Sequence, residues 1–120
     1  MSNTSPNILI QHDNGVMVVE LLNEEILEEP TINSIADSLF NVIMENPGVR
    51  MALSFKQVKH FSSSALGMLI RLNKRIEQAS GELCLTEIRP SLMEIFIITK
   101  LNKLFTICET RAEALKTLKS

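Results

Sequence analysis

The chain has 120 residues, of which 45% are hydrophobic and 22% charged, and its formal net charge is −2. This composition indicates a soluble domain with an apolar core of its own, and it excludes the basic surface that nucleic-acid binding requires. No apolar run approaches the about 20 residues that insertion into a membrane needs. Because the polar start lacks a hydrophobic signal core, we expect a cytoplasmic protein. Residues 1–120 are expected to form a single domain, with residues 1–7 flexible.

The first half of the chain predicts a hairpin, a helix and a buried strand. Two apolar β-type runs within residues 7–22 flank Asn14 and Gly15, a pair typical of hairpin turns because such turns need positive φ. An acidic loop follows. Residues 30–46 then show helical spacing of apolar side chains and open on a proline, which is favoured as a first helical residue. Residues 49–55 form a short apolar run typical of a strand covered on both faces.

The second half predicts alternating helices and strands. A helix begins near Ser62 or Ser63 and ends at Ser80-Gly81, and its apolar stripe consists of Ala65, Leu69, Leu72 and Ile76, widened by Leu66 and Ile70. A strand over 82–88 follows, and Pro90 then opens a helix whose apolar face consists of Leu92, Ile95, Phe96 and Thr99. The last two elements are a strand over 104–108 and a helix that begins with the capping box Thr110-x-x-Glu113. The order β-β-α-β-α-β-α-β-α indicates an α/β fold with about four helices, whose mixed sheet is mostly parallel after the opening hairpin.

The cysteines and histidines give no sign of a metal site or cofactor. Cys84 and Cys108 both lie in apolar, strand-like segments, where buried free thiols are favoured over a disulfide or a metal-binding pair. His12 and His60 have no Cys or His neighbour at the spacing of metal ligands. We therefore expect neither a metal nor a cofactor.

Three consecutive serines, residues 62–64, stand at the mouth of a predicted helix that follows a buried strand. Serine is a favoured N-cap, so one of the three is expected to cap the helix. Capping needs a single serine. A helix start also carries free N–H groups and partial positive charge, which suit a phosphate. Besides capping and phosphate binding, a small hydrolase that uses His60 to activate a serine is a third hypothesis, but no G-x-S-x-G elbow surrounds these serines.

The segments "FSSSALG" (61–67) and "TKLNKLF" (99–105) resemble two motifs of the STAS domain of bacterial anti-sigma factor antagonists. Members of this family carry an apolar residue, then Asp-Ser-Ser/Thr-Gly-Leu-Gly before a helix, and a later Thr-Gly-Leu segment. The resemblance covers residues 8–118. It implies a non-enzymatic regulator that binds an anti-sigma factor, itself a serine/threonine kinase, and so frees the sigma factor. It also implies that the kinase ends this binding by phosphorylating Ser63, and that a phosphatase reverses the modification.

The family's partner-binding surface maps onto the serines and the acidic loop. The residues it implies are Asn23, Glu24, Glu25, Ser62, Ser63, Ser64, Leu66 and Gly67. Three positions depart from the family pattern: Ser62 replaces aspartate, and Ala65 and Lys100 replace glycine. A STAS module that binds without being phosphorylated, as a stressosome-type scaffold or a lipid-transport subunit, is the alternative. The expected state is a monomer or a weak dimer.

Overall fold

The computed structural model describes residues 7–118, which contain seven strands, four α-helices and one 3-10 helix. The strands are β1 (Ile8–Asp13), β2 (Val16–Leu21), β3 (Glu25–Ile26), β4 (Arg50–Ser54), β5 (His60–Phe61), β6 (Glu82–Thr86) and β7 (Thr106–Cys108). The helices are α1 (Glu29–Glu45), α2 (Ser63–Gln78), α3 (Pro90–Ile98) and α4 (Arg111–Leu118), with the 3-10 helix η1 at Leu101–Lys103.

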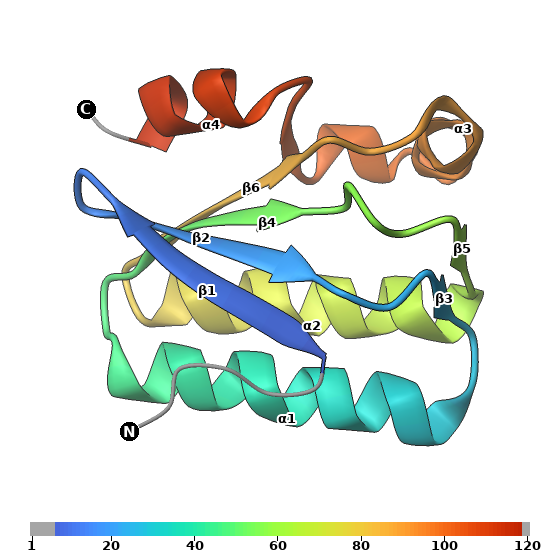
Figure 1. Ribbon diagram of the computed structural model, residues 1–120, viewed down its shortest axis with the longest axis horizontal. Coiled ribbons are helices and arrows are strands. Elements are labelled where there is room, and N and C mark those ends of the chain that lie inside the picture. Colours follow the sequence, from blue (N-terminus) through green and yellow to red (C-terminus); the bar gives the residue numbers. More distant parts are fainter. Residues whose placement is uncertain (1–6, 119–120) are drawn as a thin grey trace.

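Five of the strands form one mixed sheet in the order β1-β2-β4-β6-β7. The β1–β2 pair is antiparallel, and every other pair in this sheet is parallel. The hairpin turn has φ of +52° at Asn14 and +84° at Gly15, the backbone that the Asn-Gly signal predicts. Helices α1 and α2 lie side by side under one face, and α4 crosses the other face (Figure 1). The predicted α/β fold is confirmed.

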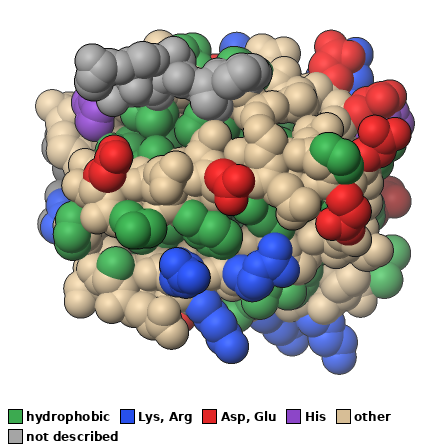
Figure 2. Space-filling view, turned by 90° about the horizontal axis from the view of Figure 1, so that it is seen from below, with side chains coloured by type: hydrophobic (Ala, Val, Ile, Leu, Met, Phe, Trp, Pro, Cys, Tyr) green, Lys and Arg blue, Asp and Glu red, His purple; other side chains and the backbone are tan. Residues whose placement is uncertain are grey.

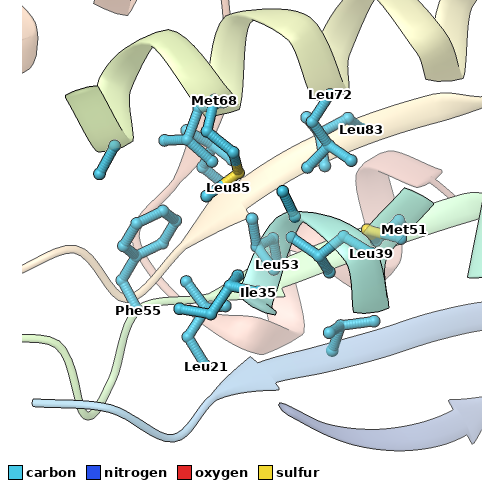
Figure 3. Packing of buried hydrophobic residues seen from close by; sticks show 14 of the residues in the cluster. Leu21, Ile35, Leu39, Met51, Leu53, Phe55, Met68, Leu72, Leu83 and Leu85 are labelled. Carbon is cyan, nitrogen blue, oxygen red and sulfur yellow. The ribbon is translucent and has the colours of Figure 1, made fainter. Parts of the chain in front are cut away.

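The main core lies between the sheet and the pair α1–α2. The strands alternate, so that the large side chains of β2, β4 and β6 all point toward these helices, where they meet apolar residues at helical spacing (Figure 3). Leu53 and Leu69 are fully buried there. At the carboxyl ends of β4 and β6 the core is closed by α3, whose Phe96 packs edge-on against Phe55 with 6.3 Å between ring centroids.

The opposite face of the sheet is covered by α4 and carries smaller side chains. Val18, Ala52 and Cys84 point to this side from three adjacent strands and pack against Ala114 of α4. Eight residues of helix cover this face, compared with 33 in α1 and α2 together (17 in α1 and 16 in α2). Apolar surface on a sheet must be covered by another element, and α4 covers it here. Because the side chains on this face are small, the short helix can lie close to the sheet.

The structure differs from the sequence expectations at element boundaries. The short parallel pair β3–β5 was not predicted, since strands of two residues show no usable period. Strand β7 begins at Thr106 rather than at residue 104, and Leu104 is exposed. Thr99 is exposed rather than part of the core face, because it caps α3 by donating its hydroxyl to the carbonyl of Ile95 at 2.7 Å.

Of residues 1–7, for which flexibility is expected, the structure describes only Asn7. Asn7 is 8% exposed, and its side-chain amide donates to Ser34 Oγ at 2.6 Å. Residues 1–6 lie outside the described residues. None of the helices in the described part of the chain is long and apolar enough to cross a membrane.

Candidate functional site

The first turn of α2 is capped by Ser62. Its backbone is extended, its hydroxyl accepts a hydrogen bond from the N–H of Ala65 at 3.2 Å, and its carbonyl accepts one from the N–H of Leu66 at 3.1 Å. The hydroxyl satisfies one of the N–H groups that a helix start leaves unpaired, and the carbonyl accepts the first hydrogen bond of the helix itself. Ser62 therefore has the capping role that the sequence predicts for one of the three serines. The family's aspartate at this position would supply the same kind of oxygen acceptor.

Ser63 and Ser64 are the first two residues of α2, and both are exposed. Neither hydroxyl makes a hydrogen bond with any described residue, and their two N–H groups lack an acceptor within the same part of the chain. The two hydroxyls thus contribute no hydrogen bond to the described fold. Their hydroxyls are available to a second molecule, beside N–H groups that favour a negative charge.

The short β3–β5 pair brings the acidic loop beside these serines. Glu25 pairs with His60, and the carbonyl of Glu24 accepts hydrogen bonds from the N–H groups of Lys59 (2.8 Å) and His60 (3.1 Å). The N–H of Ser62 donates to the carbonyl of Ile26 at 3.1 Å, so that the ladder continues to the helix cap. Segments more than 30 positions apart in the sequence thereby form one continuous surface.

This surface is acidic and partly apolar. Glu24, Glu25 and the two following glutamates, Glu28 and Glu29, are all exposed. Figure 2 shows acidic side chains gathered at the end of the molecule where Figure 1 places β3, whereas Lys and Arg side chains gather along another part of the face. Lys59 lies 3.6 Å from Glu24, as an exposed ion pair. Leu22 and Leu27 are 40% and 46% exposed within the same loop.

Leu66 and Gly67 occupy different environments although they are neighbours. Leu66 is only 7% exposed and belongs to the core, so it offers little of its surface to a partner. Gly67 is partly exposed and lies one turn after Ser63 on the same side of α2. A Cβ added at Gly67 would meet nothing nearer than Arg71 Nη1 at 3.9 Å. The fold therefore does not need a glycine there.

Asn23 adds an unsatisfied polar atom next to the acidic loop. Its side chain is half-buried, and its Oδ1 is buried without a hydrogen-bond partner in the described part of the chain. A buried acceptor without a donor is unfavourable by about 1–3 kcal/mol.

His60 lies in β5 with its side chain exposed. Within residues 7–118, no hydrogen bond joins its imidazole to a serine, and no group of three or more His, Cys, Asp or Glu residues could hold a metal ion. The serine–base contact on which the hydrolase reading depends is thus not formed in this structure.

The structure shows the environments of Ala65 and Lys100, the two residues that replace glycine in the family motifs. Ala65 is fully buried in the first turn of α2, where its methyl group belongs to the core. Lys100, which stands where glycine is common, follows α3 with φ of +62° and ψ of +17°, in the left-handed region. A non-glycine side chain is unfavourable in that conformation.

Comparison with known proteins gives consistent similarities. The family model described as STAS domain matches residues 7–114. The anti-sigma F factor antagonist of Paenibacillus polymyxa is 26% identical over 111 residues, which cover 92% of this chain and 93% of that protein. The structure of an anti-sigma-factor antagonist (STAS) domain protein from Planctomyces limnophilus has a TM-score of 0.82 at 22% identity, covering 95% of this chain and 99% of that one. The phosphorylated form of the Bacillus cell fate determinant SpoIIAA has a TM-score of 0.67 at 17% identity, covering 92% and 97%. At these identities the solved structures establish a common fold.

Proposed function

Because this chain belongs to the STAS domain family, we propose that it is an anti-sigma factor antagonist whose binding is switched by phosphorylation of Ser63. The unmodified protein binds an anti-sigma factor that is also a serine/threonine kinase, and so releases a sigma factor. The observation that carries the proposal is the exposed Ser63 hydroxyl at the start of α2, beside an acidic loop and free of any bond to the described residues. The matching name of the Paenibacillus relative supports the same assignment.

The proposed contact area is the serine–acid surface, defined as Asn23, Glu24, Glu25, Ser63, Ser64 and Gly67. Its glutamates would attract a basic partner surface and speed the encounter, since exposed charges act mainly on association rates. Gly67 leaves the face of α2 flat, so that a partner backbone can approach closely. The predicted contributions of Ser62 and Leu66 are indirect, because Ser62 caps the helix and Leu66 anchors it in the core.

Phosphorylation would act on the complex rather than on the fold. A phosphoryl group adds about −1.5 to −2 charges and three acceptor oxygens at Ser63. In the free protein, the start of α2 can accommodate this charge through its N–H groups. Within a close interface, the same group must lose its water and fit against a partner shaped for a neutral hydroxyl. The domain therefore keeps its structure while the complex dissociates, and a phosphatase restores binding.

The test is phosphate incorporation by the protein's own partner kinase. The purified chain is incubated with ATP and an extract of its source cells, and its intact mass and phosphopeptides are measured. We expect one phosphate on Ser63, lost in Ser63→Ala and retained in the matched control Ser64→Ala. The phosphorylated protein should no longer retain the anti-sigma factor that the unmodified protein captures from the same extract.

Two outcomes would change the assignment. Phosphate on Ser62 or Ser64 with Ser63 unmodified would show that the motif alignment is displaced by one residue. A captured anti-sigma factor kinase that leaves every serine unmodified in the presence of ATP would favour a binding-only STAS module. That alternative is supported by the start of α2. The family's aspartate is replaced there by Ser62, and the first turn of the helix contains no acidic residue.

A further inference from the structure

Cys84 and Cys108 lie in direct contact at the edge of the sheet. Cys84 Sγ donates to Cys108 Sγ at 3.1 Å, although the two residues are 24 positions apart in the sequence. Both are free thiols. The contact arises because β6 and β7 are parallel neighbours and Cys108 is paired with Thr86, two residues beyond Cys84, on the same side of the sheet.

The two thiols differ in their access to solvent. Cys84 is 0% exposed and packs with Val18, Ala52 and Ala114 under α4. Cys108 is partly exposed on the edge strand, with its Sγ 3.6 Å from Oγ1 of the exposed Thr117. Burial raises the pKa of the Cys84 thiol to about 12, and its hydrogen bond with Cys108 adds to the rise. A soluble oxidant therefore reaches the outer thiol, Cys108, before the inner one.

We propose that Cys84 and Cys108 form a redox-active dithiol that hydroperoxides oxidise to a disulfide. In the first step Cys108 gives up its proton, and its thiolate sulfur attacks the peroxide, breaks the O–O bond and becomes a sulfenic acid. The alkoxide or hydroxide that leaves takes up a proton in place of the one that Cys108 released and departs as an alcohol or water. In the second step the Cys84 sulfur attacks the sulfenic sulfur. The S–S bond forms, and the hydroxyl leaves as water with the proton from Cys84. Two electrons pass from the two thiols to one peroxide.

The strand that must move is the one least constrained by the sheet. A disulfide has an S–S length of about 2.05 Å, so the two sulfurs must approach by about 1 Å. Strand β7 has three residues, lies at the edge and pairs within the sheet with β6 alone. A small shift of β7 therefore breaks few other contacts. The bond would close a loop that contains α3 and η1, and loop closure stabilises the folded state by restricting the unfolded chain.

The test is oxidation of the purified full chain, at low protein concentration, with hydrogen peroxide. We expect the intact mass to fall by about 2 Da, with loss of both free thiols and recovery of both on addition of dithiothreitol. Peptide mapping should find Cys84 linked to Cys108. The melting temperature of the oxidised monomer should rise by several degrees and return after reduction.

Two variants separate this site from unspecific oxidation. Cys108→Ser changes a partly exposed side chain and should remove the mass loss, while its circular dichroism stays that of the parent. Cys84→Ser should leave Cys108 as a sulfenic acid, heavier by about 16 Da and trapped by dimedone. The proposal is overturned if the wild-type chain gains oxygen at either cysteine without forming the bridge, or forms only intermolecular dimers. It is equally overturned if both thiols stay reduced while glutathione in the same tube is oxidised.

Discussion

Ser62 Oγ lies 3.2 Å from the backbone nitrogen of Ala65 and accepts its hydrogen bond. This bond fixes the start of α2, whose first residue is the exposed Ser63. Ser62→Ala removes this acceptor and should lower the free energy of unfolding by about 0.5–2 kcal/mol, as measured by urea denaturation. Ser62→Asp is the matched control, because it restores an acceptor and places negative charge at the helix start. Equal losses in both variants would show that the cap is not what stabilises this turn.

Leu69 tests the assignment of the core face of α2. Its side chain is fully buried under the sheet, so Leu69→Ala should lower the free energy of unfolding by about 2–5 kcal/mol. The neighbouring Ile70 is only partly buried, and Ile70→Ala should cost clearly less. Urea unfolding of the two variants checks the order. A larger loss for Ile70→Ala would mean that the helix is rotated relative to the sheet.

Gly67 allows stability and binding to be separated. Because an added Cβ has room and helix interiors disfavour glycine, Gly67→Ala should raise the free energy of unfolding by up to about 1 kcal/mol. If a partner packs closely on the serine–acid surface, the same variant should bind the anti-sigma factor more weakly. Thermal melts and titration calorimetry measure the two effects. A variant that is more stable and binds as tightly as the parent would remove Gly67 from the proposed contact area.

Lys100 is held in the left-handed region, with φ of +62°. Glycine adopts this conformation without the penalty of about 1–2 kcal/mol that other residues carry. Lys100→Gly should therefore stabilise the domain, by an amount reduced through the greater freedom of glycine in the unfolded chain. Lys100→Ala removes the same charge while keeping a Cβ, so it should bring no such gain. Comparable melting temperatures for the two variants would argue against strain at this residue.

The paired substitution Glu24→Lys and Glu25→Lys tests the proposed role of the acidic loop. Both side chains are exposed and the ion pair of Glu24 with Lys59 lies at the surface, so the fold should be little affected. Association with the anti-sigma factor should slow and lose much of its dependence on salt, which stopped-flow fluorescence can measure. An unchanged association rate would identify the glutamates as a solvated loop.

The order of the main elements follows from local chemistry that the sequence displays directly. Asn14-Gly15 needs positive φ and so specifies the hairpin. The stripe from Ala65 to Ile76 has the period of a helix, and every residue predicted for its centre is buried. One half of the capping box is also formed, with Thr110 Oγ1 accepting from the N–H of Glu113 at 3.1 Å, whereas the Glu113 carboxylate accepts from the N–H of Glu109 at 2.9 Å. Each of these features depends on residues within a few positions of one another, which is why reading the chain in order finds them.

Local sequence patterns of this kind predict only part of the candidate site. The sequence by itself placed three serines at a helix start and an acidic loop about 40 positions earlier. Only the tertiary structure decided that Glu24 meets Lys59 and His60 through backbone hydrogen bonds and that Cys84 touches Cys108. The physical reason is that these contacts join segments far apart in the chain. Backbone N–H and carbonyl groups are the same in every residue, so local periodicity carries no record of which distant segments they pair.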